Sequence, residues 1–261
     1  AASCGAAVSL AQGLLSLMDS SVCPFSGKIT VVGCPAEEGG GGKVLLAKKG
    51  VFNPLTVAMM AHPDRRTEPI KKMLSLIEIE IEFLGRASHA AAAPEHGINA
   101  LDAAVWTYLD IGKFRKTASK DASIHGIFTS AGTKPNIISP HAALHYYVRS
   151  LDMANTRMIV KKMEKIARKN AKKIGAGLKW KINPIAYEPF HPNRALASIF
   201  REQLKFLKIK DEQGSETKGI GSSDVGNVGN IVPTIHPSIK ITNGHACHTA
   251  AFAKAALTDI A

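Results

Sequence analysis

Apolar and polar residues alternate strictly along 76–84, LIEIEIEFL. The isoleucines and the phenylalanine fall on one face of this segment and the three glutamates on the other. A period of two residues is typical of a strand with one buried face and one face in water. We therefore predict a half-exposed strand here.

Helical and strand patterns follow this segment up to residue 187. They predict a helix over 99–116, strands over 124–130 and 142–149, a helix in the lysine-rich segment 156–174, and a strand over 178–187. The order βαββαβ is that of the ferredoxin-like split-βαβ sandwich, in which two helices cover one face of a single sheet. The sequence thus predicts a domain over 76–187 that folds as its own unit.

The flanking segments 1–75 and 188–261 have a different pattern. They predict an amphipathic, packed helix over 1–18, a strand over 28–33, a short helix over 43–49, a strand over 56–62 and a helix over 195–207. Alternating strands and helices favour an α/β layer. We therefore predict one α/β domain that the 76–187 domain interrupts.

Composition and charge exclude some classes of protein. Of the 261 residues, 45% are hydrophobic and 21% are charged, and no run of about 18 apolar residues exists, which indicates a globular chain with no membrane partner. The net charge of +12 is concentrated in 156–174, where eight basic residues accompany Glu164 alone. Apolar residues recur there at helical spacing, so the sequence favours a solvated helix face over a polyanion site, and we predict no nucleic-acid partner.

Four cysteines occur without a CxxC pair or regular spacing. That usage does not indicate a disulfide framework or a cysteine-rich zinc site, and it predicts a reducing compartment, the cytoplasm.

Two adjacent carboxylates, Glu37 and Glu38, follow the predicted strand 28–33 and precede four glycines. Adjacent carboxylates repel each other unless a cation compensates them or one takes a proton. A metal ion would satisfy both, because one carboxylate could bind it while its neighbour takes a proton from water. The glycines would then let the backbone pass close to the site. The alternative is a solvated loop with chance acids.

Histidines offer further candidate ligands. His62 ends the predicted strand 56–62, where it is either a cap or a ligand, and His245 and His248 flank Cys247 near the C-terminus. Imidazole and carboxylate from three separate loops form a plausible zinc set, although no fixed-spacing motif joins them.

Several motifs occur in a single order along nearly the whole chain. They are VGCPAEEGGGGKVLLAKKGVF, then SHAAAAPEHGINALDAA (88–104), KPNII (134–138), YYVR (146–149), GSSDVGNV (221–228), VPTIHP (232–237) and HTAAF (248–252). With these motifs the chain closely resembles the zinc aminoacylase/carboxypeptidase (peptidase M20) superfamily, in particular its amidohydrolase branch.

This resemblance implies a fold and an activity. It implies a catalytic α/β zinc-peptidase domain interrupted by a lid domain that also forms a homodimer. The implied reaction is metal-dependent hydrolysis of an amide bond next to a free carboxylate, in a small peptide or an N-acyl amino acid, with basic dipeptides as a candidate class. The implied cofactor is Zn²⁺, two ions per site, with Mn²⁺ or Co²⁺ as alternatives.

The resemblance also implies roles for seven residues: Glu37 as the general base; Glu38, His62 and His248 as metal ligands; His89, reaching from the partner's lid to the tetrahedral oxyanion; and Asn136 and Arg149 as substrate-binding residues. Taken singly, His89 could be a polar residue at the start of a helix, Asn136 a turn former and Arg149 a surface charge. Asp224 could line the pocket or belong to an ordinary turn.

A further Cys/His pair, in a HACGH-like segment before residue 1, is also implied. Cys4 lies near that place, but the first histidine of the printed chain is His62. Three of five implied ligands remain, which predicts an incomplete dinuclear site in the chain as printed. Two hypotheses follow: a metal-dependent dipeptidase or amidohydrolase, and a truncated, inactive homologue that acts by binding or dimerisation. A basic nucleic-acid binder ranks below both.

Overall fold

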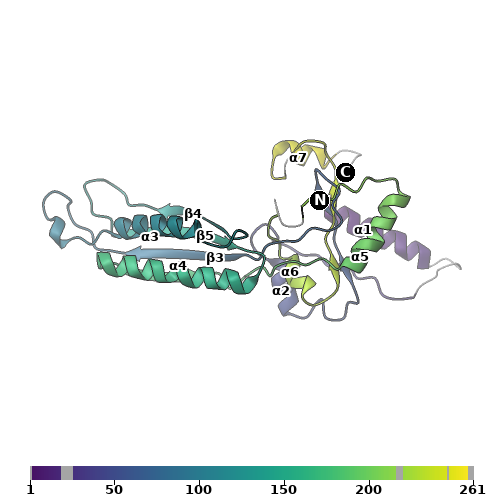
Figure 1. Ribbon diagram of the computed structural model, residues 1–261, viewed down its shortest axis with the longest axis horizontal. Helices are drawn as coiled ribbons and strands as arrows, with labels where there is room; N and C mark the ends of the chain where they lie inside the picture. Colours follow the sequence, from purple (N-terminus) through teal and green to yellow (C-terminus); the bar gives the residue numbers. More distant parts are fainter. Residues whose placement is uncertain (1, 19–25, 216–219, 246, 258–261) are drawn as a thin grey trace. The chain divides into compact units, whose positions relative to one another are not determined.

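The computed structural model describes residues 2–18, 26–215, 220–245 and 247–257, and its contacts divide the chain into two units (Figure 1). Unit 1 comprises Ala1–Met73 and Phe190–Ala261, and unit 2 comprises Leu74–Pro189. The domain limits expected from the sequence, after residues 75 and 187, each lie two residues from these boundaries.

Unit 2 contains one four-stranded sheet and two long helices. Its elements, in chain order, are β3 (Ile77–Leu84), a 3-10 turn (Pro94–His96), α3 (Ala100–Arg115), β4 (Ser123–Ser130), β5 (His141–Arg149), α4 (Met153–Ile174) and β6 (Gly177–Ile182). The strands lie in the order β4-β5-β3-β6, and every neighbouring pair is antiparallel. This is the predicted βαββαβ sandwich.

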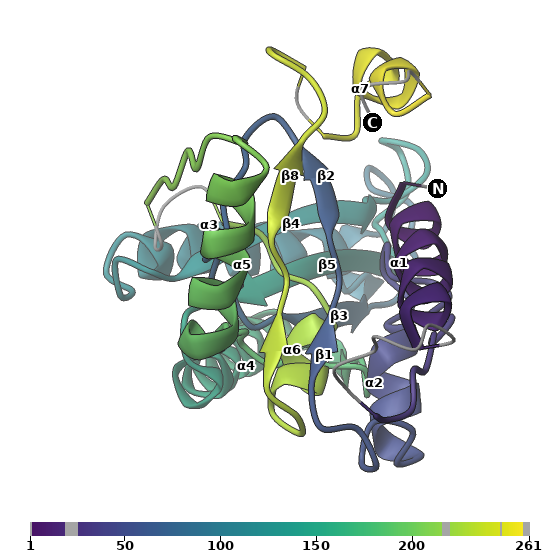
Figure 2. The same cartoon turned by 90° about the vertical axis from the view of Figure 1, so that its right-hand side faces the viewer.

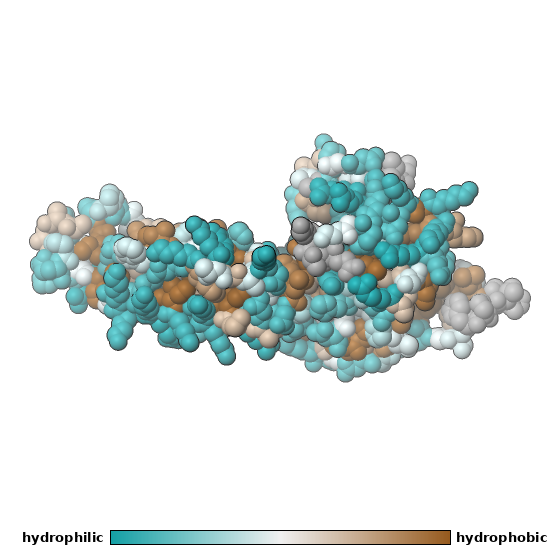
Figure 3. All heavy atoms as spheres, viewed as in Figure 1, coloured by the Kyte–Doolittle hydropathy of each residue, from teal (hydrophilic) through white to brown (hydrophobic). Residues whose placement is uncertain are grey.

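The alternation in β3 determines which face of the sheet is buried. Ile79, Ile81 and Phe83 are fully buried in a cluster that includes the inner residues of α3 and α4. Asp152 caps α4 by accepting hydrogen bonds from two backbone amides of its first turn, and Gly175 ends the helix in a left-handed conformation. The eight basic residues of 156–174 are all exposed, as the hydrophilic side chains along α4 in Figure 3 illustrate, so the solvated-face interpretation holds.

Unit 1 is built around two short parallel strand pairs. Its elements are α1 (Ala2–Met18), α2 (Gly42–Lys48), β1 (Ala58–Met59), β2 (His62–Asp64), α5 (Arg194–Phe206), α6 (Val225–Gly229), β7 (Thr234–Ile235), β8 (Ser238–Lys240) and α7 (Ala250–Ala255). β1 pairs with β7 and β2 with β8 in one common register, which makes a single parallel ribbon. Figure 2 shows this ribbon between α1 and α5.

The predicted strand 56–62 therefore forms as two short pieces. The amide of His62 donates to the carbonyl of Pro237, but Pro237 has no N–H to donate in return. One rung of the ladder is lost at that point, and β1 and β2 are separated there. The predicted strand 178–187 is also shorter than expected, because β6 ends at Ile182 just before Asn183 and Pro184.

Two predictions for unit 1 are wrong. Residues 28–33 do not form a strand, because no described segment pairs with them, and alternation alone cannot supply the hydrogen bonds of a ladder. α1 exists, but Val8, Leu15 and Leu17 are each about half exposed, so it is not the packed amphipathic helix expected. Across the part of the chain that the structure describes, no helix is both long and apolar enough to cross a membrane.

Candidate active site

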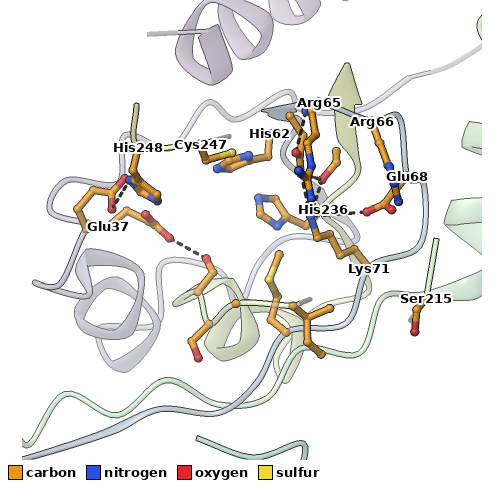
Figure 4. A pocket seen from close by; sticks show the side chains of 18 residues that line it. Glu37, His62, Arg65, Arg66, Glu68, Lys71, Ser215, His236, Cys247 and His248 are labelled. Carbon is orange, nitrogen blue, oxygen red and sulfur yellow. Dashed lines mark hydrogen bonds and ion pairs between the residues drawn. The ribbon is translucent and has the colours of Figure 1, made fainter. Parts of the chain in front are cut away.

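A cavity of about 700 Å³ lies within unit 1. Four residues predicted from the sequence line it: Glu37, Glu38, His62 and His248. They come from the loop before α2, from the start of β2 and from the loop before α7, so segments distant in sequence converge on one cavity (Figure 4).

The loop that presents Glu37 and Glu38 is compact. Gly41 adopts the left-handed conformation, with φ 59°, and α2 begins immediately after it at Gly42. A Cβ atom on Gly42 would lie 1.9 Å from the carbonyl oxygen of Pro35, which leaves no room for a side chain. The glycines therefore fold the loop tightly back on Pro35, which is a more local reason for them than the expected close approach to the site.

Glu38 and His248 meet at one wall of the cavity. His248 Nδ1 lies 3.9 Å from Glu38 Oε2, and their side chains are 74% and 79% exposed. His248 has φ 65°, a left-handed conformation that costs energy for any residue other than glycine. The backbone is thus held in a sparsely populated conformation at the residue predicted to bind metal.

His62 has a defined tautomer. Its Nδ1 lies 2.7 Å from the carbonyl oxygen of Pro63, and because a carbonyl oxygen only accepts, Nδ1 must carry the proton and donate. The Nε2 atom of the neutral ring is then a lone-pair donor. Metal-binding histidines characteristically use this arrangement, with one nitrogen bound to a backbone carbonyl and the other left for the ion.

His236 is a residue of this cavity that the sequence analysis did not identify. It is 2% exposed, neither ring nitrogen has a hydrogen-bond partner in the described part of the chain, and its ring lies edge-on to His62 with centroids 5.6 Å apart. Burial, and then the charges of His62, Lys43 and Lys71, lowers the pKa of His236 to about 3, so the ring is neutral. Its motif VPTIHP was visible, but no local pattern distinguishes a buried histidine from an exposed one.

The opposite wall is polar and internally paired. Lys71 Nζ lies 2.8 Å from Asp64 Oδ2, and Ser238 Oγ donates to the same oxygen at 3.1 Å. Burial alone would raise the pKa of Asp64, but hydrogen bonds from Lys71 and from the amide of Arg65 hold it below its ordinary value. Asp64 therefore stays ionised.

The donor chemistry of the cavity fits a metal ion. Glu38 offers carboxylate oxygens, and His62 and His248 offer imidazole nitrogens, which are the ligands that Zn²⁺ takes in proteins. Within 2–18, 26–215, 220–245 and 247–257, however, no three His, Cys, Asp or Glu side chains are close enough together to hold an ion. Closing the set requires His62 and the Glu38–His248 pair to approach each other.

Not every predicted residue of unit 1 reaches this cavity. His245 lines a separate hollow beside α7. Asp224, considered as a pocket residue, is fully buried, and its carboxylate accepts hydrogen bonds from both the backbone amide and Nζ of Lys43, each at 2.9 Å. It is one half of a buried ion pair.

Unit 2 brings His89 and Asn136 together. Their loops are joined because the amide of Ala90 donates to the carbonyl of Asn136 at 3.0 Å. His89 Nδ1 accepts from the amides of Ala91 and Ala92, so the neutral ring carries its proton on Nε2, as an exposed donor. That tautomer is the one needed to donate a hydrogen bond to an oxyanion.

Arg149 lies at the other end of the same sheet. It is the last residue of the nine-residue strand β5, whereas the His89–Asn136 pair lies beyond the first residue, His141. Eight steps of about 3.4 Å place the two ends roughly 27 Å apart. Arg149 Nε is buried and has no hydrogen-bond partner among the described residues, and the guanidinium lies 5.4 Å from the centre of the Tyr147 ring.

Comparison with known proteins supports this division of the chain. Residues 74–175 match the peptidase dimerisation domain of the M20 family. The chain is 36% identical to the Xaa-Arg dipeptidase of Mus musculus over 251 residues, which are 95% of this chain and 58% of that protein. It is 26% identical to the N-acetyldiaminopimelate deacetylase of Streptococcus suis over 62% of this chain and 46% of that protein. The chain thus spans only about half the length of these curated relatives.

Solved structures show the same fold. A putative aminohydrolase from methicillin-resistant Staphylococcus aureus has a TM-score of 0.66 at 14% identity, covering 85% of this chain and 63% of that one. The aminobenzoyl-glutamate utilization protein from Klebsiella pneumoniae has a TM-score of 0.61 at 18% identity, covering 80% of this chain and 54% of that one. Both the motifs and the fold agree with these comparisons, and the chain belongs to the peptidase M20 superfamily, with the dimerisation domain of that family in unit 2.

Proposed function

We propose that this chain is the greater part of a metal-dependent dipeptidase or amidohydrolase that cleaves an amide bond next to a free carboxylate. The observation that carries the proposal is the convergence of Glu37, Glu38, His62 and His248 on one cavity of about 700 Å³. The similarity to Xaa-Arg dipeptidases supports the same reaction class.

In the proposed mechanism Glu38, His62 and His248 hold the metal, for which Zn²⁺ is the first candidate and Mn²⁺ or Co²⁺ are alternatives. When bound, such an ion polarises the amide carbonyl and makes water more acidic. Glu37 takes the proton from the attacking water and returns it to the leaving nitrogen. His89 donates from Nε2 to the developing oxyanion, and Asn136 and Arg149 hold the substrate.

The two ends of unit 2 favour a site shared between protomers. His89 and Asn136 are roughly 27 Å from Arg149 along β5, a separation that no dipeptide spans. One protomer therefore cannot offer both ends of its unit 2 to the same substrate. We propose that each site takes Arg149 from one protomer and the His89–Asn136 pair from its partner.

Unit 2 offers surfaces for such a homodimer. Val105, Trp106 and Leu109 of α3 are each between 38% and 48% exposed, and Ile127 of β4 is 62% exposed. β4 is an edge strand that has no described neighbour on its outer side. Apolar side chains beside an open edge are suited to pairing with a second copy.

We infer a basic dipeptide, such as β-alanyl-lysine or an Xaa-Arg peptide, as the substrate class, because the name that the mouse and human relatives share specifies arginine. The cytoplasm remains the predicted compartment, since Cys4, Cys34 and Cys247 are free thiols.

Hydrolysis of a dipeptide panel tests the proposed function. The full-length protein loaded with Zn²⁺ should cleave β-alanyl-lysine and Xaa-Arg dipeptides, lose this activity in a chelator, and be at least about 10-fold slower when the C-terminal carboxylate is amidated, because a bidentate arginine contact is lost. No cleavage of any member of the panel by a metal-loaded, dimeric protein would instead support the homologue that only binds or dimerises.

A further inference from the structure

Glu37 is held by a residue that the proposed mechanism does not yet use. Ser223 Oγ donates a hydrogen bond to Glu37 Oε1 at 2.9 Å, across 186 positions of sequence. Ser223 is 4% exposed and lines the same cavity. A buried hydroxyl is thus directed at one oxygen of the proposed general base.

The next residue anchors the other end of the same loop. Asp224 accepts from the backbone amide and from Nζ of Lys43, and both partners of this ion pair are almost completely buried. Glu37 and Lys43 bound the glycine run, so two consecutive residues, Ser223 and Asp224, hold the start and the end of the 37–43 loop. A buried charge that is paired at two points is costly to displace, which keeps Ser223 in place relative to this loop.

Between these two contacts the loop backbone has little freedom. Gly42 packs directly on Pro35, and the amide of Gly39 donates to the carbonyl of Glu37 at 2.8 Å. The main remaining freedom at Glu37 is rotation of its own side chain. A hydrogen bond to Oε1 restricts that rotation and determines how the carboxylate is presented to the cavity.

We propose that Ser223 is a positioning residue that orients the Glu37 carboxylate for proton transfer, with the Lys43–Asp224 ion pair as its anchor. This inference rests on the proposed function, in which Glu37 is the general base. A misoriented base lowers the rate of the chemical step without weakening substrate binding, because the contacts that hold the substrate are elsewhere.

Ser223→Ala tests the proposal in the full-length, metal-loaded protein. We expect kcat to fall about 10- to 100-fold, with KM and the thermal melting temperature unchanged, and Ser223→Thr to recover most of the loss because it keeps a hydroxyl. The matched control is Ser238→Ala, which removes a buried serine that lines the same cavity but donates to Asp64; its kcat should stay within about twofold of the wild type.

An unchanged kcat in Ser223→Ala, or an equal loss in Ser238→Ala, would overturn the proposal while leaving the proposed function intact. If the wild type cleaves no peptide, the proposed function fails and the contact is tested by urea unfolding of Ser223→Ala, Glu37→Ala and the double variant. Non-additive changes in the unfolding midpoint would then support the Ser223–Glu37 contact, and additive changes would contradict it.

Discussion

Glu37→Gln is expected to lower kcat by about 10²- to 10⁴-fold, the range that general-base catalysis contributes, while metal binding stays the same. Glutamine has nearly the shape of glutamate and keeps an oxygen that can accept the hydrogen bond from Ser223. It cannot take a proton from water, so only the chemical step should be affected. Steady-state kinetics on a cleavable dipeptide, with metal content measured on the same samples, give both values.

Glu80→Gln is the matched control for this substitution. Glu80 lies on the exposed face of the unit 2 sheet, where it pairs with Lys181 at 2.9 Å, far from any residue in the proposed mechanism. Its loss should change kcat by less than about twofold, since exposed ion pairs contribute little. Equal kcat values for Glu37→Gln and the wild type would remove Glu37 from the role of base.

Mixing two inactive variants should restore activity if each site is shared between protomers. His89→Ala and Glu37→Gln should each be nearly inactive as homodimers. In a mixed dimer, one of the two sites has an intact Glu37 from one protomer and an intact His89 from the other. With random exchange half of the dimers are mixed, so we expect about a quarter of the wild-type activity.

A second mixture controls for restoration by other means. Glu37→Gln mixed with His248→Ala should recover nothing, because both residues line the same cavity of one protomer and every mixed site stays defective. Mixed dimers can be counted by native mass spectrometry. If they form and the His89→Ala mixture remains as inactive as its parents, His89 does not act in its partner's site.

Unit 2 was predictable because its elements follow local periodicity. The alternation in β3 has its expected counterpart in three fully buried side chains, and the lysine side of α4 lies in water. Unit 1 was harder because its order depends on pairing between distant segments. Residues 28–33 have the alternation of a strand but no described neighbour to pair with, and the position of Pro237 divides the ribbon.

The site shows the same contrast. The Glu37–Glu38 pair, His62 and His248 were identified from residue type and motif, and the structure brings them to one cavity. Ser223, Lys43 and His236 were missed because their importance lies in contacts across the fold. A serine in a Gly/Ser/Asp loop looks like a turn residue until its hydroxyl is found 2.9 Å from a carboxylate.

Metal titration of the wild type and single variants tests the central claim most directly. Equilibrium dialysis with Co²⁺ should show at least one ion bound per chain, and Glu38→Ala, His62→Ala and His248→Ala should each weaken binding by more than about 10-fold. His245→Ala, which alters a histidine of the separate hollow beside α7, should bind as the wild type does. Equal affinities across all four variants and the wild type would contradict a metal site at this cavity.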